Sequence, residues 1–318
     1  MTRSKRLKKP RAVTILLIAL AVCAALIIWW ASTPLKNNEN KETHMDQNSP
    51  NIDWMSKLDD ALTLNELSIP ATHDSGATIS FMGISGQCQK TTIKEQLYMG
   101  VRFFDIRLRL VNDELTVFHG FVDQNLTFAS VLEDINEFIE KYPSEFLIMS
   151  IKQEDDPKDS TLIFHEKVEA DLAQFPLISG DREFPATVGE ARGKIYIFSR
   201  YGEASIGVPA SPGWMDSTSF ELNGLYVQDK YRITDITQKT EAFEKALEIA
   251  AEKKYTLVLN FASCYLENAL PPASASKTAK EINPYLLKLL RDQKSPVGVI
   301  LCDYITDELC DVIIKNNF

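Results

Sequence analysis

From residue 52 to the carboxyl terminus, short runs rich in β-branched residues alternate with amphipathic segments, and this alternation constrains the fold more than any other feature. Eight runs have the length and composition of buried strands: 67–69, 101–107, 115–119, 146–152, 194–200, 225–229, 256–262 and 297–303. Five segments have helical character: 92–99, 128–141, 161–175, 237–254 and 278–293. Strands that alternate with helices predict a parallel sheet, and eight of them predict an α/β fold of the (β/α)8 TIM-type barrel class.

Two connections are incompatible with a regular barrel. Residues 111–114 are too few to form a crossover helix between parallel strands. Residues 201–224 are rich in glycine, proline and serine and have no helical periodicity. We therefore expect an irregular barrel, and since no second break in composition follows residue 52, we expect residues 52–318 to form one domain.

The amino terminus has a different character. Residues 1–11 contain six basic residues and no acidic one, and residues 12–32 follow as an uncharged, mostly apolar run. That run has about the 20 residues that a membrane-spanning helix needs, and Trp29 and Trp30 near its end suit an interfacial aromatic belt. We interpret these parts as a basic cytoplasmic tail and a transmembrane signal anchor. The polar, Asn-rich residues 33–51 are typical of a flexible linker.

If the basic tail stays in the cytoplasm, the residues that follow the apolar run lie on the other side of the membrane. A cleaved signal peptide, which would make the protein secreted, is the alternative; the apolar run is longer than the 7–15 residues usual in signal peptides. Four cysteines lie beyond the run, and their spacing matches no zinc or disulfide framework, so buried free thiols are expected. They are Cys88, Cys264, Cys302 and Cys310.

The charge of the chain excludes one class of partner. The formal net charge is −10, from 34 basic and 44 acidic residues. The tail contributes +6, so the remaining residues carry 28 basic and 44 acidic side chains, or −16. Neutralisation of phosphates by Lys and Arg supplies most of the affinity for nucleic acids. An acidic body therefore argues against a nucleic-acid partner.

Polar side chains recur where the predicted strands end. The carboxyl ends of parallel barrel strands meet on one face, which is where such barrels carry their chemistry. The side chains concerned are His73, Asp105, Arg107, His119, Lys152, Arg200, Asp229 and Asp303. The other two histidines, His44 and His165, lie in polar surroundings and are expected on the surface.

Two imidazoles and a guanidinium are sufficient for metal-free cleavage of a phosphodiester. One neutral histidine removes a proton from the attacking hydroxyl, and one protonated histidine donates a proton to the leaving oxygen. Arginine neutralises the phosphate through paired hydrogen bonds. His73, His119 and Arg107 fit these roles, and the neighbouring carboxylates of Asp74 and Asp303 could orient the imidazoles.

The sequence resembles the bacterial phosphatidylinositol-specific phospholipases C from about residue 54 to the carboxyl terminus. The matching segments are WM at 54–55, SIPATHDSGA at 68–77, GVRFFDIRLRL at 100–110, VFHG at 117–120, PSEFLIMSIKQE at 143–154, ARGKIYIFSRY at 191–201, VQDKY at 227–231, LNFAS at 259–263 and DYI at 303–305. The order of THDSG, FDIR and HG is specific to this family. The apolar segment after THDSG is shorter than in the secreted relatives and lacks tryptophan; Phe81, Met82 and Ile84 could replace its membrane contact.

The resemblance implies a role for each matched position. His73 corresponds to the general base with Asp303 beside it, His119 to the general acid with Asp74, and Arg107 to the phosphate ligand. The inositol-binding positions correspond to Lys152, Arg200, Asp229 and Tyr231, and Asp105 is grouped with them as a residue that pairs with Lys or Arg inside the site.

The implied reaction cleaves phosphatidylinositol to diacylglycerol and inositol 1,2-cyclic phosphate, which is hydrolysed more slowly to inositol 1-phosphate. No metal or other cofactor is expected. The implied partner is phosphatidylinositol, or a glycosylated inositol lipid, at a membrane surface, and the protein is expected to be a monomer.

Two alternatives remain open. A metal-dependent glycerophosphodiester phosphodiesterase would need a cluster of carboxylates on the second strand, where this chain has Phe-Asp-Ile-Arg at residues 104–107. A non-catalytic protein that binds inositol glycans would not need the acid–base residues, all of which are present here.

Overall fold

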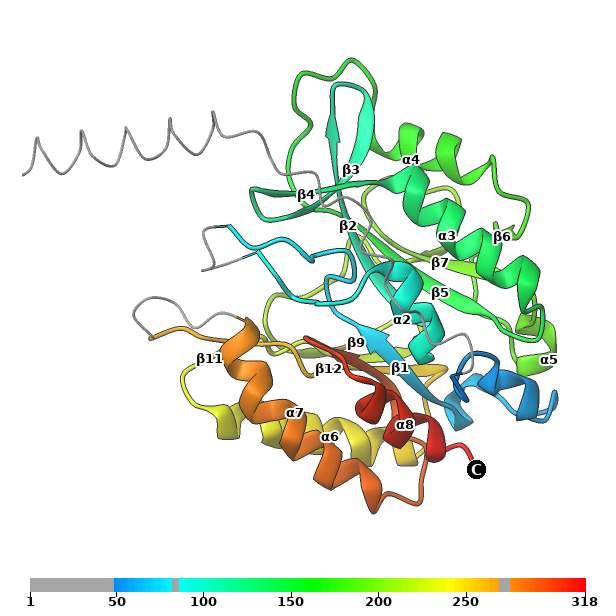
Figure 1. Ribbon diagram of the computed structural model, residues 1–318, viewed down its shortest axis with the longest axis vertical. Helices are drawn as coiled ribbons and strands as arrows, with labels where there is room; N and C mark the ends of the chain where they lie inside the picture. The colour runs from blue at the N-terminus through cyan, green and yellow to red at the C-terminus, as the bar shows by residue number, and fades with distance from the viewer. Residues whose placement is uncertain (1–48, 82–85, 269–274) are drawn as a thin grey trace, which may run out of the picture. The chain divides into compact units, whose positions relative to one another are not determined.

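The computed structural model describes residues 49–81, 86–268 and 275–318, which belong to one compact unit, Met45–Phe318 (Figure 1). A curled sheet lies at its centre. Seven of its strands are β1 Ser68–Thr72, β2 Phe103–Val111, β5 Leu147–Gln153, β7 Ile195–Arg200, β10 Leu225–Gln228, β12 Leu257–Phe261 and β14 Gly298–Cys302. They pair in parallel in the order β7, β5, β2, β1, β14, β12, β10. Each overlaps a predicted run, so the barrel-like α/β architecture is confirmed.

The run 115–119 is the exception. It forms β3 (Glu114–His119), which pairs antiparallel with β2. Asn112 and Asp113 connect the two strands with φ angles of 51° and 65°, the left-handed backbone of a tight hairpin turn. The prediction of eight parallel strands is therefore wrong, because a two-residue link can only return the chain antiparallel. β4 (Val122–Thr127), which was not predicted, pairs antiparallel with β3.

The sheet does not close into a ring within the described residues. Beside β7 it ends in the short strands β6 (Ile178–Ser179) and β8 (Val208–Pro209), and beside β10 it ends in antiparallel β9 (Ser219–Leu222). The connection from β7 to β10 thus consists of two short strands and loops, as its lack of helical periodicity predicts. A separate parallel pair is formed by β11 (Arg232–Ile233) and β13 (Tyr265–Leu266).

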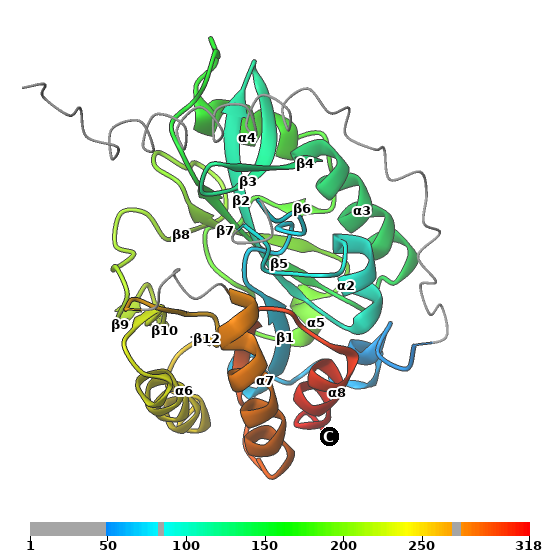
Figure 2. The same cartoon turned by 60° about the vertical axis from the view of Figure 1, so that its left-hand side comes forward.

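Helices cover the outside of the sheet (Figure 2). They are α2 Ile93–Met99, α3 Phe128–Lys141, α4 Phe164–Leu172, α5 Val188–Ala191, α6 Ile236–Ala251, α7 Ala275–Arg291 and α8 Asp307–Lys315, with short 3-10 turns at Trp54–Lys57 and Leu64–Glu66. The five predicted helices are all present. Helix α3 has the predicted bounds, and it begins where the Thr127 side chain accepts a hydrogen bond from the backbone N–H of Ser130. Helix α8, which was not predicted, packs against β1 and α7.

The carboxyl ends of the parallel strands carry polar side chains although they are buried. β1, β12 and β14 are buried at every residue, as expected for parallel strands covered on both faces. Thr72, Gln228, Asn260 and Asp303 nevertheless lie buried at or next to the carboxyl ends of their strands. Buried polar groups need partners. The candidate site lies at these carboxyl ends.

The predicted amino-terminal parts lie almost entirely outside the described residues. Neither the tail at 1–11 nor the apolar run at 12–32 is described, and among the described residues no helix is long and apolar enough to cross a membrane. The predicted linker ends too late, because Asn51 is buried and its side-chain amide donates to the carboxylate of Asp311 at 2.5 Å. The folded body therefore includes Asn51.

Candidate active site

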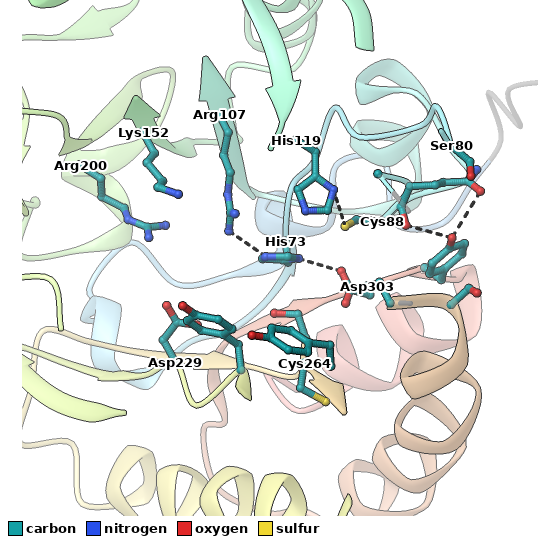
Figure 3. A pocket seen from close by; sticks show the side chains of 18 of the residues that line it. His73, Ser80, Cys88, Arg107, His119, Lys152, Arg200, Asp229, Cys264 and Asp303 are labelled. Atoms are coloured by element: carbon teal, nitrogen blue, oxygen red, sulfur yellow. Dashed lines mark hydrogen bonds and ion pairs between the residues drawn. The ribbon is translucent and has the colours of Figure 1, made fainter. Parts of the chain in front are cut away.

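A pocket of about 930 Å³ opens at the carboxyl ends of the parallel strands (Figure 3). Its lining includes eight of the ten predicted site residues: His73, Arg107, His119, Lys152, Arg200, Asp229, Tyr231 and Asp303. The other two, Asp74 and Asp105, are 1% and 0% exposed and lie beneath the lining side chains. The structure therefore brings all ten residues together from several strands and the turns that follow them.

His73 and Asp303 meet because their strands are neighbours in register. Thr72 of β1 pairs with Cys302 of β14, so the residues that follow them lie side by side. The Nδ1 atom of His73 is 2.8 Å from Oδ1 of Asp303, and Nε2 is 2.7 Å from Nη2 of Arg107. Arg107 can only donate, so Nε2 accepts and Nδ1 carries the proton given to Asp303. Burial and the charge of Arg107 lower the pKa of His73, but the charge and hydrogen bond of Asp303 together with the charge of Asp74 outweigh them, so the pKa is raised from its ordinary value.

Asp105 holds two arginines together. Its Oδ2 accepts from Nη2 and Nε of Arg107 at 3.0 and 3.1 Å, and its Oδ1 accepts from Nη1 of Arg200 at 3.1 Å. Burial raises the pKa of Asp105, but Arg107 and Arg200 outweigh burial and bring it well below its ordinary value. The predicted pairing within the site is therefore present. Because Asp105 is fully buried with both oxygens engaged, it positions the arginines and does not itself face the pocket.

Asp74 lies between the two imidazoles. Its Oδ2 is 3.6 Å from Nε2 of His73, 3.6 Å from Nε2 of His119 and 3.0 Å from Nη1 of Arg107. Asp74 has a φ of 45°, in the left-handed region that aspartate tolerates better than most residues, and this turns the chain sharply after β1. His119 ends β3 and directs its other ring nitrogen, Nδ1, at the thiol of Cys88, 3.7 Å away. Asp74 is thus shared by both histidines, whereas the sequence paired it with His119 alone.

Three cationic side chains form a row across neighbouring strands. Arg107 on β2 is the register partner of Lys152 on β5, which is the register partner of Arg200 on β7. Residues in register on parallel strands point to the same side, and all three line the pocket. This row is suited to an anionic ligand.

An aromatic residue supports the far side of the row. The guanidinium of Arg200 lies 3.6 Å from the centre of the Trp214 ring, and the ring nitrogen of Trp214 donates to Oδ2 of Asp229 at 3.0 Å. Tyr231, two residues after Asp229, donates its hydroxyl to Asp216. Cationic donors and a carboxylate acceptor therefore face the same end of the pocket, an arrangement that can bind a ring with neighbouring hydroxyls.

Comparison with known proteins decides the family. Residues 63–201 match the family model described as phosphatidylinositol-specific phospholipase C, X domain. A 1-phosphatidylinositol phosphodiesterase of Staphylococcus aureus (strain Newman) is 32% identical over 294 residues, which cover 83% of this chain and 93% of that protein. The chain belongs to the bacterial phosphatidylinositol-specific phospholipase C family. A 1-phosphatidylinositol phosphodiesterase of Listeria monocytogenes is 27% identical over 283 residues, covering 83% of this chain and 84% of that protein.

The fold of this phospholipase C family member agrees with a solved relative. A double mutant of the Staphylococcus aureus phosphatidylinositol-specific phospholipase C superposes with a TM-score of 0.76 at 30% identity. The match covers 85% of this chain and 98% of that chain.

Among the residues of the site that were not predicted from the sequence, Glu154, Trp214 and Cys88 contact the predicted ones directly. Glu154 accepts from Lys152 at 2.8 Å and from the backbone N–H of Gly120 at 2.8 Å, so it ties β5 to the turn after His119. It lies two residues beyond Lys152, and this spacing on a strand could have revealed it. Trp214 lies in an irregular segment and Cys88 in a loop, where no periodicity distinguishes a pocket residue from any other.

One cluster has the composition of a metal site, but its chemistry is unsuitable. Single ligand atoms of His73, Asp74 and Cys88 lie within 4.8 Å of one another. The guanidinium of Arg107 contacts both His73 and Asp74, and burial raises the pKa of the Cys88 thiol well above 9.0 and so keeps it protonated. A hard cation such as Ca²⁺ prefers several oxygen ligands and would be repelled by the arginine. These residues therefore do not fit a calcium site.

Proposed function

We propose that this protein is a metal-independent phosphatidylinositol phospholipase C. It cleaves phosphatidylinositol to diacylglycerol and inositol 1,2-cyclic phosphate, and it opens the cyclic phosphate more slowly to inositol 1-phosphate. One observation carries the proposal: Asp74 lies between two imidazoles, and Arg107 lies against both Asp74 and His73. The names of the Staphylococcus and Listeria relatives, 1-phosphatidylinositol phosphodiesterase, support the substrate.

In the first step the substrate supplies its own nucleophile. Nε2 of His73 takes the proton of the inositol 2-hydroxyl, whose oxygen attacks phosphorus. The bond from phosphorus to the diacylglycerol oxygen breaks, and that oxygen receives a proton from Nε2 of His119. A well-oriented intramolecular attack can reach effective molarities of about 10⁵–10⁸ M, so few protein groups are needed.

In the second step the histidines exchange roles. Neutral His119 takes a proton from water, whose oxygen attacks the cyclic phosphate. Protonated His73 returns a proton to the inositol 2-oxygen as the ring opens. Asp303 keeps the proton on Nδ1 of His73, at 2.8 Å, so that Nε2 is the nitrogen that gains and loses a proton.

The remaining residues bind the headgroup. Arg107 neutralises the phosphate with paired donors, while Asp105 fixes its orientation from below. Lys152, Arg200 and Asp229 bind the inositol hydroxyls, and Tyr231 lies beside the apolar face of the ring. All four line the same pocket as the two histidines.

Turnover in a chelator tests this function. Purified protein with EDTA and phosphatidylinositol should release diacylglycerol and inositol 1,2-cyclic phosphate, which phosphorus NMR distinguishes from inositol 1-phosphate. A glycerophosphodiester phosphodiesterase should lose activity in EDTA, since it relies on a metal. A glycan-binding protein should bind the headgroup without product. Either of these results would overturn the proposal.

A membrane surface is the proposed location of the substrate, and a glycosylated inositol lipid is a further proposed substrate. Phe121, 68% exposed, follows His119 by two residues, and its ring meets that of Phe81 edge to face at 5.3 Å. Phe121, packed on the partly buried Phe81 beside the proton donor for the leaving group, would lie in the apolar part of the interface.

We expect Phe121→Ala to lower binding to phosphatidylinositol vesicles about threefold to tenfold, because a buried aromatic side chain contributes about 1.5–3 kcal/mol and insertion is partial. Phe318 is 66% exposed at the carboxyl terminus and provides the matched control, Phe318→Ala. Vesicle sedimentation measures binding, and hydrolysis of soluble inositol 1,2-cyclic phosphate should be unchanged in both variants. Equal vesicle binding by both variants would remove Phe121 from the membrane contact.

We further propose that residues 1–11 are cytoplasmic, residues 12–32 anchor the protein in the cell membrane, and the monomeric catalytic domain lies outside the cytoplasm. The support is the basic tail followed by an apolar run of spanning length. Amino-terminal sequencing of the mature protein separates the anchor from a cleaved signal and a secreted enzyme.

A further inference from the structure

Cys88 lies between the two acid–base pairs of the pocket (Figure 3). Its Sγ is 3.7 Å from Nδ1 of His119, and burial together with the charge of Asp303, the partner of His73, raises the pKa of its thiol. The residue is 1% exposed.

The backbone holds Cys88 rigidly. Its N–H donates to the carbonyl of Ala77 at 2.8 Å, and its carbonyl accepts from the N–H of Tyr304 at 2.7 Å. The next side chain, Gln89, donates to the carbonyl of His73 at 2.8 Å. The backbone that carries the sulfur is therefore tied to the turns after β1 and β14, which contain His73 and Asp303.

His119 needs such a support. It is the last residue of β3, and Gly120 follows it with a φ of 56°, so the chain turns directly after the imidazole. Its ring is 30% exposed. Asp74 faces Nε2 at 3.6 Å, and Cys88 faces Nδ1.

We propose that Cys88 is a positioning residue that fixes the tautomer of His119. In this arrangement the S–H is directed toward the carboxylate of Asp303, whose charge acts on the thiol, and the sulfur lone pairs accept the N–H of Nδ1. Nε2 is then the nitrogen that loses its proton to the diacylglycerol oxygen and later takes one from water. This rests on the proposed function above.

The protonation state of the thiol agrees with this arrangement. Burial raises the pKa of Cys88 well above 9.0, and the carboxylates of Asp303 and Asp74 raise it further against the opposing charge of Arg107. The thiol therefore keeps its proton at neutral pH. A neutral partner can accept from the imidazolium and from neutral imidazole alike, so it supports His119 in both steps of the reaction.

Nitrogen-15 NMR of the full chain, labelled at histidine, tests the proposal without substrate. The sequence has only four histidines, so assignment by single replacement is feasible. In the wild type, the neutral form of His119 should carry its proton on Nδ1. A proton on Nε2 in the wild type would overturn the proposal, whether or not any variant folds.

Variants separate this role from a structural one. Cys88→Ala should move the His119 proton toward Nε2 and lower kcat about tenfold, the loss of one hydrogen bond at the transition state. Cys88→Ser can still donate and accept a hydrogen bond, so it should keep the His119 proton mostly on Nδ1 and retain most of the wild-type kcat. Cys310→Ala is the matched control, because Cys310 is also fully buried but lies on α8, outside the described pocket lining. It should change neither the tautomer nor kcat.

The outcomes distinguish the two proposals. An unchanged tautomer and kcat in folded Cys88→Ala would reject the role of Cys88 while leaving the phospholipase intact. A wild-type protein that forms no cyclic phosphate would reject the proposed function, and the tautomer would still report whether Cys88 orients His119.

Discussion

Replacing either histidine of the pocket with alanine should lower kcat for phosphatidylinositol by about 10²–10⁴-fold, the contribution of a positioned general acid or base. His73→Ala removes the group at 2.8 Å from Asp303, and His119→Ala removes the group that faces Asp74 from the other side. Neither ring belongs to the apolar core, so the thermal unfolding midpoint should change little. Release of cyclic phosphate measures the first step, and its hydrolysis measures the second.

The matched control is His165→Ala. His165 is on α4, with Nε2 at 3.7 Å from Glu203, whose side chain is 82% exposed. It should leave both steps within about twofold of wild type, as for a surface substitution away from the site. If His73→Ala or His119→Ala kept activity within about tenfold of wild type, below the range for acid–base catalysis, that histidine would not be the general base or acid.

Substitution of Arg107 should lower kcat about as strongly as substitution of either histidine. Removing one preorganised donor from a developing anion costs about 10²–10³-fold in kcat, and Arg107→Lys should cost at least this because lysine lacks the paired donors that also hold Asp105. Arg107→Asp should abolish activity in EDTA. It also removes the charge that compensates Asp74 and Asp105, so its thermal midpoint should fall.

Arg109 provides the control on the same strand. It lies two residues beyond Arg107 and pairs with Asp155, a half-exposed carboxylate, at 3.0 Å. Arg109→Lys should retain kcat, whereas Arg107→Lys should not. Because both substitutions preserve charge, the comparison isolates the geometry of the guanidinium. Similar kcat values for the two variants would exclude Arg107 as the phosphate ligand.

The site was largely predictable because its residues follow strands that are easy to recognise. His73 and Asp303 are each preceded by a fully buried apolar strand, and the register of parallel neighbours then brings the two side chains together. Periodicity also located α3 to the residue, because one face of that helix is continuously apolar.

The features that were predicted wrongly or missed depend on contacts that sequence periodicity does not encode. The run 115–119 has the composition of a barrel strand, and only the two-residue link before it indicates that it runs antiparallel. Trp214 reaches the pocket from an irregular loop to contact Arg200 and Asp229. Asp74 binds Arg107 more closely than either imidazole, which sequence spacing could not show.

The row of Arg107, Lys152 and Arg200 can bind an anion only when the strands that carry it are correctly aligned. The three side chains face one side only because β2, β5 and β7 pair in a single register. A slip of one residue in β5 would turn Lys152 to the opposite face and bring its apolar neighbour Ile151 into the site. A chain with misaligned strands could therefore remain compact and still lose affinity for an anion. Binding of inositol phosphate should then report strand alignment, which a measurement of compactness does not detect.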